Sequence, residues 1–304
     1  VTQKSHLKEA IMREEVEFRA LDGTRLDAFM SLPDNSNPDN EAKYPGVVLS
    51  HGFGAVKEMA LDRYAEAFSA AGLACLVYDH RNTGSSGGEL RGEIDPWQQI
   101  SDMRDAITYL RRRTDVDGSR IGLWGTSFSG GHALVVAATD PRVKCVVAVV
   151  PTISGHQNTI RALGEEGYAN FLSEVDKERV ARQSGEKPTM IPISSPGDES
   201  YEWSKVAGEG TTYINSCTLL SRAFRDAYEP GSYIPAISPT PLLMVIGSAD
   251  TKCFTDLQSD AYQGAGEPKH LEMFPGGHYD PYTTLLEAIS TASSDWFARF
   301  LATS

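Results

Sequence analysis

Residues 120–131 read Arg-Ile-Gly-Leu-Trp-Gly-Thr-Ser-Phe-Ser-Gly-Gly, and a further apolar run follows at residues 133–138. The pattern predicts a buried strand, a tight turn that contains Ser127, and a helix that begins directly after the turn. Such a turn is a nucleophile elbow: small residues on both sides let strand and helix approach closely, and the serine hydroxyl stands above the sheet. The helix N-terminus beside this hydroxyl favours developing negative charge.

The elbow departs from the usual Gly-x-Ser-x-Gly pattern at one position. Gly125 occupies the first glycine position, but Ser129 occupies the second, with Gly130 and Gly131 after it. Serine is small, so we expect the strand and the helix still to approach closely here. The alternative, a glycine-rich turn in which Ser127 only caps a helix, stays open at this stage.

The chain around the elbow alternates between short apolar runs and longer amphipathic runs. We expect strands at residues 46–49, 73–78, 120–124, 143–150, 241–246 and 270–274. We expect helices at residues 59–71, 98–112, 127–138, 257–262 and 285–301. Before them, two strand-like runs flank Asp22-Gly23 and predict a hairpin, and a surface loop is expected at residues 33–43. Apolar strands separated by helices indicate a doubly wound, mostly parallel α/β sheet with an antiparallel start.

The alternation stops between residues 151 and 239. This segment contains helical stretches at residues 165–183 and 216–228 and a proline-rich loop at residues 187–198. A connection of this length without structure of its own is uncommon in a compact domain. We therefore expect a core formed by residues 1–150 and 240–304, with residues 151–239 inserted as a mostly helical cap. Aromatic residues expected to line a substrate pocket under the cap are Tyr201, Trp203 and Tyr279.

A serine nucleophile needs a base that is oriented by an acid, and in this architecture both follow the serine along the chain. Asp250 comes directly after the apolar run 242–247, and His278 follows Pro-Gly-Gly after the next strand. Both lie at carboxyl ends of strands, where open α/β sheets place their sites. Two alternatives stay open: Asp250 as a helix cap and His278 as a loop histidine with a structural hydrogen bond.

The oxyanion formed during acyl transfer needs two backbone N–H donors in this kind of site. The first is expected from Phe128, which follows the nucleophile. The second is expected from Phe53, in the loop Ser-His-Gly-Phe-Gly at residues 50–54. His51 is expected to support this loop rather than to contact the substrate.

Composition excludes several functional classes. The 304 residues include 28 Lys and Arg against 41 Asp and Glu, a net charge of −13, which argues against binding to nucleic acid or an anionic membrane surface. No apolar run is long enough to span a membrane. The four cysteines are scattered and lack metal-ligand spacing, so we expect no metal site and no disulfide framework. The polar start of the chain suggests a cytoplasmic protein, although a leader stays open because the sequence does not begin with Met.

Four short motifs together resemble the α/β-hydrolase fold: residues 50–54, 125–131, 247–250 and 275–278. Residues 81–89, 95–97 and 264–269 narrow the resemblance to dienelactone-hydrolase-like enzymes, the group that includes fungal polyketide transferases and hydrolases of secondary metabolism. The resemblance implies a triad of Ser127, Asp250 and His278, oxyanion donors at Phe53 and Phe128, and acyl transfer to water or to an alcohol. Dienelactone hydrolases themselves carry a cysteine nucleophile, so their substrate does not carry over.

The expected function is a cofactor-free serine hydrolase or acyltransferase. Its substrate is expected to be a small molecule with an ester, thioester or lactone carbonyl and a bulky, apolar, polyketide-like acyl group. Two alternatives remain: hydrolysis of a carbon–carbon bond beside a carbonyl by the same triad, and a hydrolase-fold protein that binds a ligand without turnover. The sequence is compatible with a monomer or a homodimer.

Overall fold

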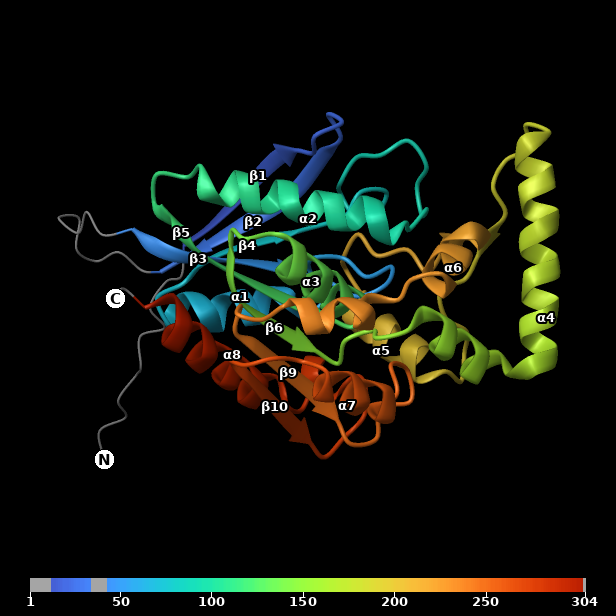
Figure 1. The fold of residues 1–304 in the computed structure, drawn as a ribbon. Helices are drawn as coiled ribbons and strands as arrows, with labels where there is room; N and C mark the ends of the chain where they lie inside the picture. Colours follow the sequence, from blue (N-terminus) through green and yellow to red (C-terminus); the bar gives the residue numbers. More distant parts are fainter. Residues whose placement is uncertain (1–11, 34–42, 303–304) are drawn as a thin grey trace, which may run out of the picture.

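The computed structural model describes residues 12–33 and 43–302, so most of the loop expected at residues 33–43 lies outside the described part. Within that part, eight strands form one sheet in the order β1-β2-β4-β3-β5-β6-β9-β10 (Figure 1). These strands are β1 (Met12–Arg19), β2 (Arg25–Leu32), β3 (Tyr44–Ser50), β4 (Ala74–Tyr78), β5 (Val116–Thr126), β6 (Val143–Val149), β9 (Leu242–Gly247) and β10 (Lys269–Phe274).

The pairing directions confirm a mostly parallel sheet with an antiparallel start. Strand β2 pairs antiparallel with both β1 and β4, and the remaining neighbours pair in parallel. The β1–β2 turn contains Gly23 with a positive φ of 88°, which suits glycine at a hairpin turn. Because the parallel strands share one direction, the loops after β5, β6, β9 and β10 emerge at the same edge of the sheet.

Helices cover both faces of the sheet, as Figure 1 shows. Side chains along β6 alternate between two buried clusters: Val146 and Ala148 join the first, and Cys145 and Val147 join the second. Helices α2 and α3 pack on the first cluster and α1 and α8 on the second. The helices of the core are α1 (Leu61–Ala70), α2 (Pro96–Arg111), α3 (Phe128–Thr139), α7 (Thr255–Gln263) and α8 (Leu286–Leu301).

Residues 151–239 leave the sheet after β6 and return at β9. They form α4 (Gly155–Gln183), β7 (Met190–Ile191), α5 (Glu199–Ala207), β8 (Cys217–Thr218), α6 (Leu219–Asp226) and the 3-10 helix η1 (Pro230–Ala236). In Figure 1, α4 and α6 stand beyond one end of the sheet, opposite the end where α8 finishes. The insertion thus lies on the side from which the loops after β5 and β6 emerge.

The structure corrects the sequence prediction at several places in this insertion. Helix α5 was not expected; Asp198 begins it by accepting a hydrogen bond from the Ser200 N–H at 2.7 Å. The proline-rich loop contains β7, which pairs with β8. Strand β8 replaces the start of the helix predicted at residues 216–228, because Thr218 caps α6 by accepting from the Ser221 N–H. Helix α4 begins earlier than predicted and is interrupted at Gly164.

Among the described residues, no helix combines the length and the apolar character that crossing a membrane requires.

Candidate active site

The turn after β5 holds Ser127 in an unusual backbone conformation. Its φ is 55° and its ψ is −118°, which is strained for a residue other than glycine. Two hydrogen bonds to the residues around β6 maintain it: the Ser127 N–H donates to the Val149 carbonyl at 2.9 Å, and the Ser127 carbonyl accepts from the Thr152 N–H at 2.8 Å. A Cβ at Gly125 would overlap the carbonyl oxygen of Ser129, so glycine is required there. These features form the predicted elbow.

Ser129, the departure from the usual motif, has a buried and fully paired hydroxyl. Its Oγ lies 2.9 Å from Nε2 of His80 and accepts from the Ser50 hydroxyl at 3.1 Å. His80 Nε2 also lies 2.9 Å from the Ser50 Oγ. Serine is therefore tolerated at the second glycine position, because Ser50 and His80 form hydrogen bonds with its buried hydroxyl. No sequence motif indicated this link between distant segments.

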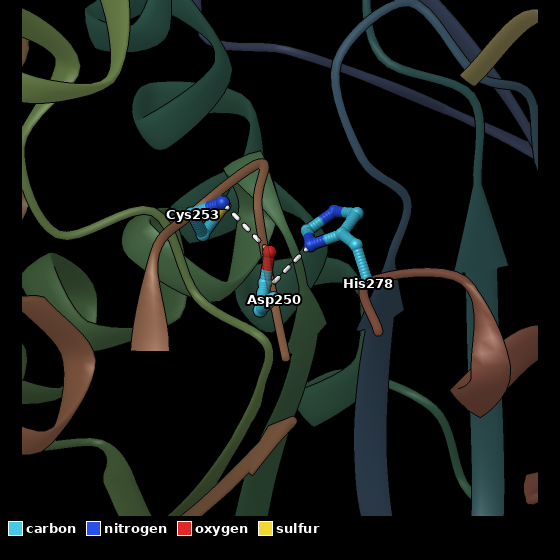
Figure 2. A group of neighbouring side chains, drawn as sticks. All are labelled: Asp250, Cys253 and His278. Carbon is cyan, nitrogen blue, oxygen red and sulfur yellow. Dashed lines mark hydrogen bonds and ion pairs between the residues drawn. The ribbon is translucent and has the colours of Figure 1, made fainter. Parts of the chain in front are cut away.

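The structure brings the three predicted side chains together. His278 Nε2 lies 3.0 Å from the Ser127 Oγ, and His278 Nδ1 lies 2.9 Å from Oδ2 of Asp250. Figure 2 shows the His278 ring and the Cys253 N–H converging on the Asp250 carboxylate. Because that carboxylate accepts, Nδ1 carries the proton and Nε2 is free to accept from the serine hydroxyl.

The Asp250 carboxylate contacts His278 and closes a turn, but it does not cap α7, whose N-cap residue is Phe254. Asp250 Oδ1 accepts from the N–H groups of Lys252 and Cys253 at 2.8 and 2.9 Å, which closes the turn before α7. Its Oδ2 accepts from His278 and from Nε2 of Gln258. Burial alone would raise the pKa of Asp250, but His278 and the two N–H groups outweigh it, so the pKa lies below its usual value. The acid is therefore a charged acceptor with a fixed orientation.

The two residues predicted to donate to an oxyanion lie on either side of Ser127. A Cβ added at Gly52 would lie 3.1 Å from the Ser127 Cβ, which shows how closely the loop of Phe53 approaches the serine. The rings of Phe53 and Phe128 pack edge to face with centroids 5.3 Å apart. Among the described residues, neither backbone N–H has an acceptor. The geometry is suited to charge stabilisation by these two groups.

His51 supports the Phe53 loop from beneath, as the sequence predicted. Its Nδ1 donates to the Gly52 carbonyl at 3.0 Å, and its Nε2 accepts from the His80 N–H at 3.3 Å. Burial lowers the pKa of His51, although the charge of Asp79 opposes this effect. A neutral ring suits the donor and acceptor roles that these bonds require.

Comparison with known proteins gives the family. The family model of X-Pro dipeptidyl-peptidases (S15 family) matches residues 22–280, most of the chain. The chain belongs to the S15 family.

Relatives of this S15-family chain include fungal enzymes as well as bacterial proteins. It is 34% identical over 282 residues to the thiohydrolase aneE of Aspergillus aculeatus, covering 86% of this chain and 84% of the relative. It is 30% identical to the polyketide transferase grgF of a Penicillium species, covering 95% and 97%. The crystal structure of that α/β hydrolase superposes with a TM-score of 0.83 over 96% of this chain and 100% of the other. The acyltransferase drtE of Aspergillus calidoustus is 32% identical, with 85% and 84% covered.

These findings confirm the predicted α/β-hydrolase fold and the relationship to fungal polyketide enzymes. They also make the chain an enzyme of the hydrolase and acyltransferase type. The narrower likeness to dienelactone hydrolases stays a prediction, as do the catalytic roles of Ser127, Asp250 and His278.

A cavity of about 720 Å³ lies between α1, α5 and the loop after His278. Trp203 and Tyr279, both predicted pocket residues, line it, and their rings stack with centroids 5.0 Å apart. Tyr201 is not among the lining residues of the described chain, and neither is Ser127. Tyr279 also packs edge to face on the His278 ring at 5.1 Å. The aromatic cavity thus approaches His278 through Tyr279 rather than Ser127.

Asp250, Cys253 and His278 have potential metal-ligating atoms within 4.8 Å of one another. Burial raises the pKa of the Cys253 thiol and the charge of Asp250 raises it further, whereas a cysteine binds metals as the thiolate. Both oxygens of Asp250 already accept hydrogen bonds. The chemistry of this cluster therefore favours a hydrogen-bonded triad over a metal centre.

Gln258 is one residue of the site that sequence reasoning missed. It is fully buried on α7 and donates to Asp250 Oδ2 at 3.0 Å, beside the bond from His278. A buried glutamine on an amphipathic helix gives no motif. The feature that could have indicated Gln258 is its position: it lies eight residues after Asp250, one turn into the helix that follows Asp250.

Proposed function

We propose that this chain transfers acyl groups from a thioester or ester to water or an alcohol through an acyl-enzyme at Ser127. One observation carries the proposal: His278 Nε2 lies 3.0 Å from the Ser127 Oγ while Asp250 holds the other ring nitrogen at 2.9 Å. A base within hydrogen-bond reach of a serine at a strained elbow is the arrangement that activates a hydroxyl.

In the first half-reaction, His278 Nε2 takes the hydroxyl proton as the Ser127 Oγ attacks the carbonyl carbon. The carbonyl electrons move to its oxygen, where the N–H groups of Phe53 and Phe128 stabilise the negative charge. Asp250 stabilises the protonated imidazole, because its pKa lies below the usual value and it stays ionised. The oxyanion then reforms the carbonyl, and the bond to sulfur or oxygen breaks while His278 returns the proton to the leaving group.

In the second half-reaction, His278 takes a proton from water or an alcohol, which attacks the acyl-enzyme. The new tetrahedral oxyanion occupies the same two donors, and its collapse releases Ser127 with its proton restored. The two half-reactions need no group besides the chain, the acyl donor and the acceptor. Hydrolysis and transfer differ only in which hydroxyl reaches the acyl carbon first.

We propose that residues 151–239 act as the cap that selects the acyl group. The names thiohydrolase and polyketide transferase of relatives that match along most of their length support a thioester of a polyketide-like acid as the substrate class. The insertion begins directly after β6, and Thr152 at its start already bonds the Ser127 carbonyl. A segment anchored to the elbow in this way is well placed to cover an acyl chain.

The test compares wild type with Ser127→Ala on N-acetylcysteamine thioesters of short and long fatty acids. Thiol release and the acid or ester product are measured together, with and without an added alcohol. We expect Ser127→Ala to lose turnover by about 10³-fold or more. Ser173→Ala, on the exposed face of α4, is the matched control and is expected to keep full activity.

Labelling by a fluorophosphonate provides a second readout that does not depend on guessing the acyl group. Wild type and Ser173→Ala should be labelled at Ser127, and Ser127→Ala should not. Turnover that survives in Ser127→Ala would contradict the proposal. Absence of labelling in the wild type would instead support a protein that binds a ligand without turnover.

A further inference from the structure

The guanidinium of Arg225, on α6 of the insertion, is the exception among the arginines of the described chain. Its Nε is buried and has no hydrogen-bond partner, and its two terminal nitrogens make no hydrogen bond or ion pair. Every other arginine there that is at least partly buried has an acceptor. Arg81 is held by Asp102, for example, and Arg182 by Glu178 and Glu93. Arg225 is therefore a half-buried arginine with a buried, unpartnered Nε and a positive charge without a counter-ion.

The neighbours of Arg225 place its charge at the edge of the active site. Its guanidinium carbon lies over the Phe53 ring, 5.2 Å from the centroid. Phe53 belongs to the loop that approaches Ser127 through Gly52. Burial raises the pKa of Cys253, and the nearby positive charge of Arg225 opposes this rise. The Cys253 Sγ lies 3.5 Å from the Thr152 hydroxyl beside the elbow. The ring of Phe53, whose N–H is a predicted oxyanion donor, thus lies against the Arg225 guanidinium.

The surroundings of Arg225 compensate its charge only in part, because the nearby Asp226 carboxylate favours the charged form but makes no ion pair with it. Burial lowers the pKa of Arg225, and the positive charge of Arg222, one helical turn earlier, lowers it further. The carboxylate of its neighbour Asp226 accepts instead from the Tyr168 hydroxyl at 3.0 Å. A cation–π contact is weaker than an ion pair and does not satisfy the N–H donors. An arginine stays charged in proteins, so the half-buried charge with its unpartnered Nε costs stability unless a ligand compensates it.

We propose that Arg225 is a specificity residue that binds a carboxylate on the acyl chain of the substrate, away from the carbonyl that Ser127 attacks. This inference rests on the proposed acyl transfer at Ser127. A guanidinium presents parallel N–H donors whose spacing matches the two oxygens of a carboxylate. Because the chain as a whole carries a net charge of −13, attraction of an anionic acyl group needs a local positive group such as this one.

The experiment uses a length series of dicarboxylic acid half-esters of p-nitrophenol. The matched substrates are esters of the same chain length that end in a methyl group. Wild type is expected to prefer the charged member of at least one pair in kcat/KM. Arg225→Met should lose about 10- to 100-fold on that member and little on its neutral partner. Arg225→Lys keeps the positive charge but loses the parallel N–H donors, so its kcat/KM on the charged ester should lie between those of wild type and Arg225→Met. Arg179→Met, an exposed change of equal charge on α4, should alter neither substrate.

A purely structural role for Arg225 gives a different pattern. If Arg225 only held the Phe53 loop, Arg225→Met would slow both esters equally and lower the unfolding temperature. The proposal expects an unchanged or higher unfolding temperature for Arg225→Met, because an uncompensated charge is removed. Equal losses on the paired esters, or no preference for any charged ester in wild type, would overturn it.

A binding measurement separates this inference from the proposed function. Calorimetry of the charged half-ester with Ser127→Ala, alone and combined with Arg225→Met, reports the subsite without turnover. Weaker binding by about 10-fold or more in the double variant supports the subsite even if Ser127 proves not to be the nucleophile. Equal affinities would refute it even if Ser127 proves essential for turnover.

Discussion

The Oγ of Ser129 lies 2.9 Å from Nε2 of His80, in the buried layer directly beneath the nucleophile elbow. The same His80 nitrogen lies 2.9 Å from the Ser50 Oγ. The elbow, the end of β3 and the end of β4 are therefore joined by side-chain hydrogen bonds where the usual motif has only a glycine.

Ser129→Ala is expected to destabilise the chain without damaging the chemistry. Removal of the hydroxyl leaves the buried His80 and Ser50 groups with one partner fewer, which costs about 1–2 kcal/mol of unfolding free energy. The activity should stay within a few-fold of wild type, since the hydroxyl faces His80 rather than the substrate side. Urea unfolding and thioester turnover check both parts, with Ser173→Ala as the exposed control. A loss of turnover comparable to that of Ser127→Ala would refute this separation.

The sheet and the three predicted side chains follow from local sequence signals, whereas the polar layer beneath them does not. Apolar runs and glycines sufficed to place Ser127, Asp250 and His278 at carboxyl ends of strands, and the structure brings them within hydrogen-bond distance. The contacts of Ser50 and His80 with Ser129 could not be predicted, because they join residues 79 and 49 positions apart. Such contacts depend on strand order, which periodicity alone does not determine.

Asp250→Asn is expected to reduce kcat by about 10⁴-fold while the fold is kept. The N–H groups of Lys252 and Cys253 require an acceptor at the Oδ1 position, so the amide oxygen takes that place. The amide nitrogen then faces Nδ1 of His278 and donates to it. Nδ1 loses its proton to the other ring nitrogen, so Nε2 carries a hydrogen and is unable to accept from Ser127.

The matched control for this change is Asp256→Asn, which neutralises an exposed carboxylate paired with Arg161 at 2.8 Å. Steady-state kinetics should show wild-type turnover for the control. Circular dichroism should show both variants folded. If Asp250→Asn stays within 10-fold of wild type, the orienting role assigned to Asp250 is wrong.

Gly52→Ala is expected to lower kcat/KM by about 10-fold or more. The added Cβ would lie 3.1 Å from the Ser127 Cβ and 3.5 Å from its Oγ, so the serine or the Phe53 loop has to shift. Small displacements of a nucleophile or of an oxyanion donor reduce the rate strongly. The rates of ester turnover and of fluorophosphonate labelling should fall together.

Gly264→Ala is the control for this glycine change, because its added Cβ would have ordinary contacts of 3.4 Å and 3.8 Å at the end of α7. Neither glycine has the positive φ that would strain an alanine. The comparison therefore isolates the steric effect beside Ser127. Equal activities of the two variants would contradict the close approach of the loop.

The insertion was the least predictable part of the chain, for a physical reason. Helix α5 carries no strong apolar period, and only Ser204 is buried along it. Its start depends on the side chain of Asp198, which the sequence grouped with the preceding loop. The unpaired charge of Arg225 could not be predicted from the sequence either, because an arginine on an amphipathic helix is usually exposed or paired.

The stability of the chain is expected to fall as the pH drops below about 6.5, and His132 is expected to be one cause. It is buried between the Tyr228 hydroxyl at 2.9 Å and Gln99 Oε1 at 3.0 Å, and burial lowers its pKa to about 3. The unfolded chain binds a proton at this residue near pH 6.5, and the folded chain does so only near pH 3. The contribution of His132 is therefore fully present above pH 6.5 and is lost as the pH falls toward 3.

His132→Gln removes this titration while it keeps a donor and an acceptor between the same neighbours. The variant is expected to be less stable than wild type at neutral pH, because the shorter amide packs less well, but to lose less stability on acidification. Between pH 6.5 and 5 the difference in that loss should reach about 2 kcal/mol, since each pH unit below the unfolded pKa contributes about 1.4 kcal/mol. Urea unfolding at both pH values measures it, with His270→Gln on exposed β10 as the control. Equal losses of stability in wild type and His132→Gln would show that the acid sensitivity arises at other residues. The buried His51 and His80 would then be the next to replace, because burial lowers both of their pKa values as well.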